Sequence, residues 1–442
     1  MLNYLEKSKY VLGLNARNLT YLRPSNSSRA VRIADNKLLT KGILKKAGLP
    51  VLETYSIIRQ TRELKGFDWT SLPPTFVLKP NRGLGGEGII IVFGRKKKFP
   101  HPWVRADRRE IRAQDLEDHI LNILEGTFSL AGLPDMAFFE ERVKLLKLLK
   151  PYSFRGIPDI RIIVYNSVPI MAEMRLPTEE SGGKSNLHLG GIGVGIDMGT
   201  GITTTAIQRD RIIEYAPGTR MMLRGIQIPN WEEVLRLAIL AQQVTRIGFL
   251  GIDIALDRDK GPMILELNVR PGLSIQIANL SPLKDRLQRV KGLKVKTINK
   301  GVKIAQDLFG GEIEEGLEEI SGRKVIGINE PIEVLDAQKN RHPTTAKVDT
   351  GAYRTTICAS LAEAMGINKI IGHKKVRGAL GMEERPIINL SFILDKRLVT
   401  TEAFMADRTE MKYDIIVGRR DLKRFLVDPA KNVFMGRRQR SV

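Results

Sequence analysis

Two apolar stretches joined by a short polar turn constrain the fold of this chain most. Residues 251–256 and 263–269 each read as a buried strand, and the turn DRDKG between them fits an antiparallel pair. Side chains two apart on a strand point to the same face, so Glu266 and Asn268 project together. The pairing brings Asp253 close to both. Because burying such groups without partners costs several kcal/mol, we expect them to hold a ligand.

These three side chains predict a metal site. Carboxylate and amide oxygens are the ligands that Mg²⁺ prefers, and a Mg²⁺ ion of this kind usually also contacts substrate phosphates. We therefore predict Mg²⁺, or Mn²⁺ in its place, at Asp253, Glu266 and Asn268. No HExxH or CxxC pattern occurs, and the five histidines have no ligand spacing, so zinc is not expected.

A glycine-rich hairpin supplies a second element of a phosphate site. Residues 75–80 and 89–93 read as strands, and the loop NRGLGGEG between them follows Lys79. The loop glycines let backbone N–H groups close over anionic oxygens. Alone, such a hairpin is weak evidence, because most are ordinary turns.

The composition limits the class of protein. The 442 residues suffice for two or three domains, and no apolar run approaches the ~18 residues of a membrane-spanning helix. A single cysteine, Cys358, and the absence of a signal-peptide pattern predict a cytoplasmic protein. The net charge of +22 favours anionic partners, or reflects solvated Lys and Arg. Aromatic residues do not interleave with basic ones, so nucleic acid is not an expected partner.

Periodicity predicts the main elements of the N-terminal region. Helices are expected over 34–47 and through WEEVLRLAILAQQV, where Asn230 can act as the cap. Strands are expected over 136–143, and two more within 159–175.

The character of the chain changes after residue 290. A basic stretch and an acidic, glycine-flanked stretch predict a linker, and short strands then dominate, with a helix near 360–364. We therefore expect a first domain over 1–290, a linker over 291–324 and a second domain over 325–442.

Several short motifs occur in one order along the first domain. They are DNK with Lys37, the Lys79 loop, FFEERV, DIR, SNLHLGG and the Asp253 to Asn268 set. Together they resemble the ATP-grasp ligases over about residues 30–290, and especially the glutamate ligases that extend a ribosomal protein tail. The resemblance implies an α+β ATP-grasp fold that uses ATP and Mg²⁺. It also implies two substrates, an amino acid such as glutamate and a carboxylate-bearing acceptor peptide or metabolite.

The same resemblance implies the nucleotide contacts. Lys37 and Lys79 would bind the α- and β-phosphates, and Asp159 the ribose. The loop glycines would cover the β- and γ-phosphates, namely Gly83, Gly85, Gly86 and Gly88. The backbone at the end of the FFEERV strand would meet adenine, through Glu140, Glu141, Arg142 and Val143.

A reacting centre is also implied. The residues that face the γ-phosphate and the acyl phosphate would be Arg161, Arg175, Lys184 and Asn186, with Arg175 and Lys184 catalytic. In this family a carboxylate attacks the γ-phosphate, giving an acyl phosphate and ADP, and an amine then displaces phosphate to form an amide. Arg270 and Gly272 would lie near the acceptor.

The chain departs from these ligases in two places. The segment before Asn36 is too short for their N-terminal domain, and the stretch between Glu141 and Asp159 is longer. This stretch carries the basic run VKLLKLLKPYSFR, which we read as a solvated loop rather than a contact to an acidic acceptor. Three alternatives stay open: a small peptide metabolite as product, a decorated envelope precursor, and a kinase that forms no amide.

A second constellation occupies the C-terminal region. An aliphatic strand leads into Asp349-Thr350-Gly351, which alone is also the pattern of an ordinary Asx turn, and DIIVG follows later. With DRTEM and LVDP, the set resembles a retropepsin-like aspartic peptidase half, of the bacterial family labelled "ATP-dependent zinc protease". The resemblance implies a mainly-β fold with Asp349, Thr350 and Gly351 as catalytic residues. One half of the fusion would build an amide-linked tail, and the other would trim or mature it.

The number of DTG motifs bears on assembly. An aspartic peptidase needs two carboxylates that share one proton, and this chain has a single DTG. We therefore predict a homodimer through the C-terminal domain, in which two Asp349 side chains meet. The alternatives are a monomer in which Asp407 or Asp414 supplies the second acid, and a domain that only dimerises or binds peptide.

Overall fold

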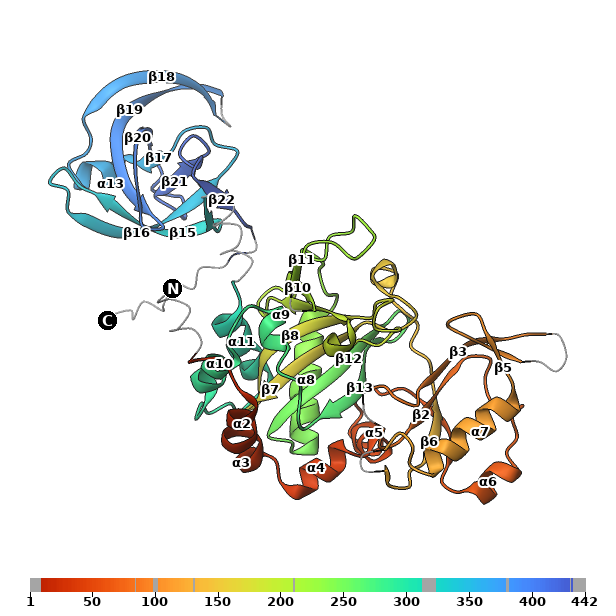
Figure 1. Cartoon of the computed structure of the whole chain (residues 1–442). Helices are drawn as coiled ribbons and strands as arrows, with labels where there is room; N and C mark the ends of the chain where they lie inside the picture. Colours follow the sequence, from red (N-terminus) through yellow and green to blue (C-terminus); the bar gives the residue numbers. More distant parts are fainter. Residues whose placement is uncertain are drawn as a thin grey trace. The chain divides into compact units, whose positions relative to one another are not determined.

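The computed structural model describes residues 9–83, 85–97, 102–129, 132–209, 211–311, 323–378, 381–429 and 431. The chain divides into two compact units, Met1–Ile313 and Glu314–Val442, each with its own hydrophobic core (Figure 1). The division falls later than residue 290 because α11 (Ile298–Phe309) packs into the core of the first unit. The first part of the expected linker over 291–324 therefore belongs to the first unit. Residues 312–322 of that linker lie outside the described ranges.

Short helices form the N-terminal part of the first unit. They are α2 (Leu14–Ala16), η1 (Arg17–Leu22), α3 (Arg23–Ser25) and α4 (Ser28–Ala34), followed by α5 (Lys37–Lys46). Asn26 joins this segment to the start of β12 (Phe249–Asp257), since its amide both donates to the Phe249 carbonyl at 2.9 Å and accepts from the Phe249 N–H at 2.8 Å. The helix predicted over 34–47 is confirmed as α5, which begins after Asn36 because the Asn36 side chain accepts from the Leu39 N–H.

The first unit contains two antiparallel sheets. A six-stranded sheet has the order β1-β6-β2-β3-β4-β5 and carries α6 (Thr61–Lys65) and α7 (Ala113–Leu124). Its strands are β1 (Thr54–Ile58), β2 (Phe76–Pro80), β3 (Ile90–Arg95), β4 (Trp103–Arg105), β5 (Glu110–Ile111) and β6 (Ala137–Glu140). The strands predicted over 75–80 and 89–93 are confirmed as β2 and β3, and the strand predicted over 136–143 is shorter, since β6 ends at Glu140.

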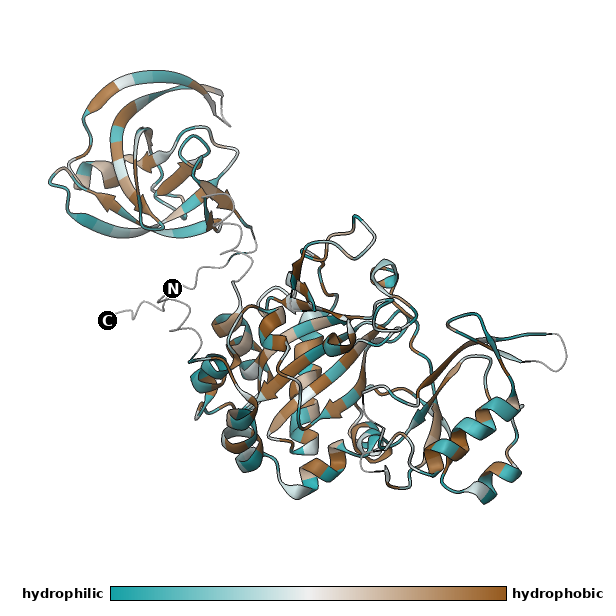
Figure 2. Cartoon of the chain, viewed as in Figure 1, coloured by the Kyte–Doolittle hydropathy of each residue, from teal (hydrophilic) through white to brown (hydrophobic). Residues whose placement is uncertain are grey.

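The second sheet of the first unit has seven strands in the order β11-β10-β9-β8-β7-β12-β13. They are β7 (Asp159–Tyr165), β8 (Val168–Leu176), β9 (Ile192–Ile196), β10 (Thr203–Gln208), β11 (Arg211–Ile213), β12 (Phe249–Asp257) and β13 (Gly261–Asn268). The helices that accompany it are α8 (Trp231–Thr245), α9 (Ile275–Ala278), α10 (Leu283–Val290) and α11. The strands of this sheet are largely hydrophobic, as Figure 2 shows, and they form the largest core of the molecule together with α8.

The predicted cap of α8 is wrong. Asn230 precedes the helix as expected, but its backbone has φ of 53° and its side chain makes no capping hydrogen bond. A side-chain cap requires an extended backbone at this position, and Asn230 is left-handed instead.

The second unit is mainly β, as predicted. Strand β15 pairs with both β16 and β19, which closes β15-β16-β21-β17-β20-β19 into a ring, and β18 pairs with β19. The elements are β14 (Lys324–Ile326), β15 (Asn329–Leu335), β16 (Arg341–Asp349), β17 (Thr356–Cys358), α13 (Ala359–Ala364), β18 (Ile370–Gly378), β19 (Gly381–Leu394), β20 (Arg397–Ala406), β21 (Ile415–Gly418) and β22 (Phe425–Val427). Among the described residues, no helix has the length and apolar character needed to cross a membrane.

Candidate active site

A cavity of 610 Å³ in the first unit gathers most of the residues that the resemblance implied for a ligase. Strands of both sheets contribute to its walls. The implied residues that line it are Lys37, Lys79, Gly83, Gly85, Gly86, Glu140, Glu141, Val143, Asp159, Arg161, Arg175, Lys184, Asn186, Asp253, Glu266 and Asn268. Arg270 and Gly272 line it as well, whereas Gly88 and Arg142 do not.

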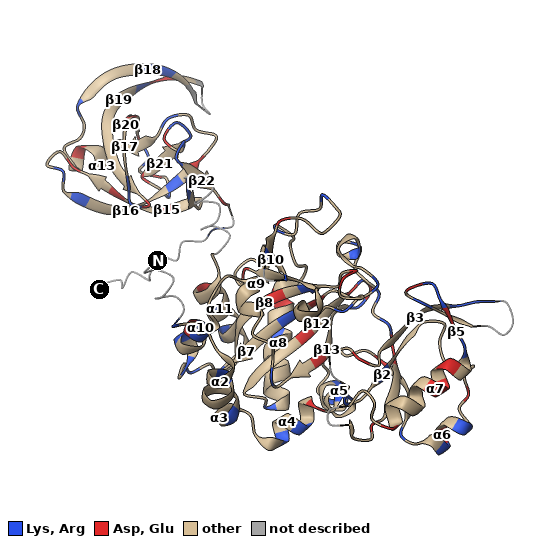
Figure 3. Cartoon of the chain, in the orientation of Figure 1, with Lys and Arg blue, Asp and Glu red and all other residues tan. Residues whose placement is uncertain are grey.

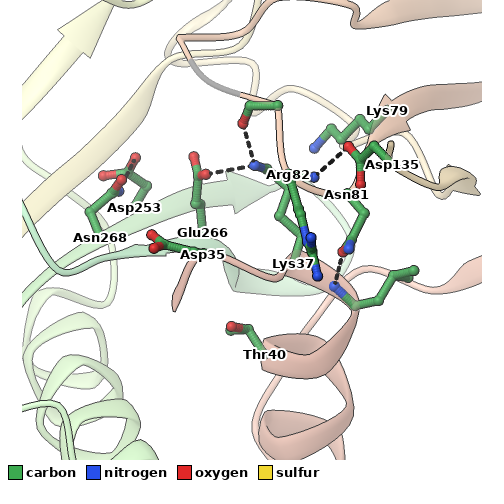
Figure 4. A network of polar contacts seen from close by, with 12 residues as sticks. Asp35, Lys37, Thr40, Lys79, Asn81, Arg82, Asp135, Asp253, Glu266 and Asn268 are labelled. Atoms are coloured by element: carbon green, nitrogen blue, oxygen red, sulfur yellow. Dashed lines mark hydrogen bonds and ion pairs between the residues drawn. The ribbon is translucent and has the colours of Figure 1, made fainter. Parts of the chain in front are cut away.

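The strand pair β12–β13 brings the three predicted metal ligands together. Asp253 lies opposite Glu266 in the antiparallel register, with a bulge directly after this pair. Asn268, two residues further along β13, donates through Nδ2 to Asp253 Oδ2 at 3.3 Å (Figure 4). The period of two in a strand therefore places all three side chains on one face, as predicted.

Asp253 is buried among arginines. Arg161 donates to both carboxylate oxygens of Asp253, at 2.8 and 2.7 Å, and Arg175 donates to Oδ2 at 2.8 Å. Arg175 also donates to Asp159 Oδ1 at 2.6 Å. Burial alone would raise the pKa of Asp253, but Arg161 and Arg175 lower it. At Asp159 burial prevails, and with the nearby Asp253 charge it raises the pKa to about 6.

Helix α5 places Lys37 beside Glu266 of β13. The Lys37 ammonium lies 3.0 Å from Glu266 Oε1 and donates to the Gly83 carbonyl at 2.7 Å (Figure 4). The start of α5 is fixed on Asn81, whose side-chain oxygen accepts from the Leu38 N–H at 2.9 Å. Lys37 thus connects a predicted metal ligand to the glycine loop.

A buried carboxylate holds Lys79. Both Lys79 and Lys41 form salt bridges with Glu140, which is 3% exposed. Burial alone would raise the pKa of Glu140, but the two lysines lower it. Lys41 was not selected from the sequence, although it is four residues after Lys37 on α5 and therefore shares its face.

The glycines of this loop are required for different reasons, either a positive φ or close packing. Gly85 and Gly86 have φ of +62° and +77°, a conformation that glycine adopts at little cost, and both line the cavity. A Cβ on Gly83 would lie 2.3 Å from Pro80 Cγ. Gly88, which was expected to cover the phosphates, does not line the cavity. A Cβ on it would lie 2.7 Å from the Phe128 ring, so a glycine is needed here for packing.

The residues after β6 border an apolar end of the cavity. Val143 belongs to a small buried cluster with Leu52, Ala255 and Met263. The Arg142 guanidinium lies 4.6 Å from the centre of the Phe93 ring, so its side chain packs away from the cavity lining, and the expected adenine contact at this residue concerns its backbone. The Glu141 N–H donates to the Glu53 carbonyl at 2.8 Å, so this backbone group is already engaged.

The SNLHLGG segment contacts the glycine loop. Asn186 Nδ2 donates to the Gly85 carbonyl at 3.1 Å, and a Cβ on Gly86 would lie 4.0 Å from Lys184 Cγ. The structure therefore places Lys184 and Asn186 beside the loop that the resemblance assigns to phosphates.

Glu173 is a buried acid that no sequence motif indicated as a site residue. It lies on β8, opposite Arg161 and two residues before Arg175. Figure 3 shows acidic and basic residues on the strands of this sheet. Both of its carboxyl oxygens are buried and have no hydrogen-bond partner among the described residues. Burial raises its pKa to about 7, against the opposing effect of Arg175 and Arg161. The signal in the sequence was a lone acid within the apolar run VPIMAEMRL.

The donor set fits a divalent cation. Asp253 and Glu266 supply carboxylate oxygens and Asn268 an amide oxygen, which are hard ligands. In this structure Glu266 pairs with Lys37, and Asp253 pairs with Arg161 and Arg175.

The second unit brings its two motifs together. Asp349 at the end of β16 lies opposite Gly418 of β21, and a Cβ on Gly418 would lie 2.4 Å from the Arg354 carbonyl carbon. Asp349 Oδ1 accepts from the N–H groups of Gly351 and Ala352, at 2.9 and 3.2 Å. This geometry is that of an Asx turn. Thr350 and Gly351 are exposed.

The solved structures that this chain is similar to are distant from it. The ATP-grasp ligase PsnB, in complex with a minimal precursor, is 19% identical, with a TM-score of 0.32 over 60% of this chain and 62% of its own. The match thus spans less than two thirds of PsnB. Biotin carboxylase from Campylobacter jejuni is 13% identical, with a TM-score of 0.41 over 66% of this chain and 55% of its own. The simian foamy virus protease is 18% identical, with a TM-score of 0.17 over 21% of this chain and 90% of its own.

Sequence comparison identifies the family. Among curated proteins, none matches the chain significantly. Residues 16–292, more than half of the chain, match the family described as "Sugar-transfer associated ATP-grasp". ATP-grasp enzymes use ATP and Mg²⁺. The chain therefore belongs to the sugar-transfer associated ATP-grasp family.

Proposed function

We propose that the first unit is an ADP-forming ligase that joins a carboxylate to an amine through an acyl phosphate, with glutamate as the amino acid to test first. The observation that carries this proposal is the single cavity in which lysines, arginines, a glycine loop and three hard oxygen donors converge.

Each group has a role in this chemistry. Lys37, Lys79 and the glycine loop orient the phosphates of ATP. Arg161, Arg175 and Lys184 stabilise the negative charge that spreads over the γ-phosphoryl group during its transfer. The substrate carboxylate forms a bond to the γ-phosphorus as the bond to ADP breaks. The amine then attacks the acyl carbon, loses a proton and releases phosphate.

Asp253, Glu266 and Asn268 would hold Mg²⁺, and the ion would supply charge neutralisation at the transferring phosphoryl group. Asp159 would contact the ribose. The backbone near Val143 would contact adenine, beside the apolar cluster that Val143 belongs to.

The main alternative for this cavity is a kinase that phosphorylates its acceptor and stops. Hydroxylamine distinguishes the two, because it converts an acyl phosphate to a hydroxamate and leaves a phosphate monoester intact. Hydroxamate formation that requires ATP and acceptor supports the ligase, and a stable phosphorylated acceptor rejects it. The other acceptors, a peptide metabolite or an envelope precursor, differ in product mass.

For the second unit we propose an aspartic peptidase that trims or matures the product and assembles as a homodimer. The supporting observation is the close approach of Asp349 to Gly418, which joins two motifs 69 positions apart in the sequence. Its rivals are a monomer that uses Asp407 or Asp414, and a domain that only dimerises or binds peptide. Asp349→Asn chains mixed in excess with wild-type chains test the shared site. Peptidase activity should fall as heterodimers form, whereas activity that simply tracks the wild-type amount after chain exchange rejects the dimer.

A further inference from the structure

The loop over 153–157 is fixed against the wall of the cavity. The Phe154 N–H donates to the Pro177 carbonyl at 3.1 Å, and Ser185 Oγ donates to the Ile157 carbonyl at 3.0 Å. A Cβ on Gly156 would lie 2.0 Å from the Gly183 carbonyl oxygen, so the backbones of the two loops are in direct contact. This loop is the end of the basic run that we read from the sequence as solvated.

Arg155 occupies a strained position in this loop. Its φ is +53°, and the Gly156 N–H donates to the Phe154 carbonyl at 2.7 Å, so Arg155 is the central residue of a γ-turn with positive φ. Such turns are rare and strained for residues with a side chain. A glycine in this position would remove the strain, and backbone strain of this kind collects at functional sites.

The Arg155 side chain faces the cavity with unbalanced charge. Arg155 lines the cavity, and its guanidinium lies 4.8 Å from the centre of the Phe154 ring. Lys37, Lys79, Arg161 and Arg175 each form a salt bridge with a carboxylate. Among the described residues, Arg155 forms no salt bridge. Its positive charge is therefore available to an anion that enters the cavity.

We propose that Arg155 binds an oxyanion of a substrate in this cavity. A guanidinium recognises the two oxygens of a carboxylate or phosphate through paired hydrogen bonds, and stacking on Phe154 restricts its orientation. The oxyanion comes either from the carboxylate of the acceptor or amino acid, or from the nucleotide phosphates. This inference rests on the proposed ligase function and adds a substrate contact to it.

The test is Arg155→Gly, which removes the charge and relieves the strain together. We expect a rise of at least about tenfold in the KM of one anionic substrate, the cost of losing one charged hydrogen-bond pair. The melting temperature should stay equal or rise. Arg155→Lys should fall between this variant and the wild type. Arg209→Gly is the matched control, since Arg209 also has positive φ (47°) but pairs with the exposed Glu180 outside the cavity lining.

The outcomes separate the sources of the oxyanion. A raised KM for the acceptor or amino acid identifies a carboxylate, and a raised KM for ATP identifies a phosphate. Unchanged KM values for all substrates in a folded Arg155→Gly protein overturn the proposal, as does an equal change in Arg209→Gly. If the wild type shows no acceptor-dependent turnover, the ligase function itself fails. Direct titrations with ATP and with the carboxylate substrates then decide, and equal affinities for all of them in wild type and Arg155→Gly reject the role of Arg155 as well.

Discussion

Asp253 and Asp349 are both strand aspartates in motifs that predicted catalysis, yet their surroundings differ. Asp253 is 4% exposed and receives hydrogen bonds from Arg161, Arg175 and Asn268. Asp349 is partly exposed and accepts from two backbone N–H groups of its own turn. A buried carboxylate requires compensating charge, and that charge comes from residues far apart in the sequence. An Asx turn requires only its own backbone, so Asp349 alone specifies less about function than Asp253 does.

The buried charges of the first unit should dominate its stability. Lys41→Met removes one of two cations from Glu140, which is fully buried, and should destabilise the unit by about 3 kcal/mol. Urea unfolding measures the change. Adding Glu140→Gln to Lys41→Met should recover part of the loss, because the buried carboxylate charge is removed and only the Lys79 ammonium remains. A Lys41→Met protein as stable as the wild type would contradict the compensation argument.

Activity should depend on Glu266 in the same cavity. Glu266→Gln keeps the size of the side chain but removes a charged metal ligand, so ADP formation should fall about a hundredfold or more. The side chain is 36% exposed, so the protein should remain folded by circular dichroism. Full ADP formation by Glu266→Gln would exclude the assigned site.

In the second unit, Asp349→Asn should leave ADP formation unchanged and abolish peptide hydrolysis.

Glu173 should make the stability of the first unit fall with rising pH. Its pKa is raised from 4.5 to about 7 in the folded protein, so the folded state binds the proton more tightly. The contribution is therefore fully present below pH 4.5 and is lost as pH rises to about 7. Glu173→Gln should be more stable than the wild type by up to about 3 kcal/mol at pH 8 and similar to it at pH 4. Equal stability at both pH values would show that Glu173 is not protonated in the fold.

A substitution at Gly418 tests the packing of the second unit, with a smaller expected effect on stability. A Cβ there would lie 2.4 Å from the Arg354 carbonyl carbon, so Gly418→Ala should destabilise this unit by about 1–3 kcal/mol. The unfolding transition of the first unit and its ADP formation should not change. Gly372→Ala is the control, because a Cβ there meets nothing within 4 Å. A loss of ADP formation in Gly418→Ala would show that the two units are coupled.

Local rules predicted which polar side chains share one face of the β12–β13 pair. The facing of Asp253, Glu266 and Asn268 follows from the two-residue period of a strand and a short turn, and the register confirms it. The positions that were missed depend on distant partners. Lys41 meets Glu140 from 99 residues away, and Arg155 reaches the cavity because its loop packs on Gly183.

The boundary of the first unit was missed for another reason. Helix α11 buries Val302, Ala305 and Phe309, and Thr297 caps it by accepting from the Lys300 N–H. This pattern was present in the sequence, but the basic residues around it favoured a linker. At Asn230 the error is the opposite one. Asparagine often caps helices, but the left-handed backbone of Asn230 prevents its side chain from capping α8.

Product analysis tests the central claim most directly. The full chain is incubated with Mg-ATP, a carboxylate-bearing acceptor and each amino acid in turn, and the products are identified by mass spectrometry. The ligase account predicts an acceptor heavier by whole amino-acid residues, with one ADP and one phosphate formed for each residue added, and no product in Glu266→Gln. Formation of AMP, or an acceptor heavier only by a phosphoryl group, would contradict it.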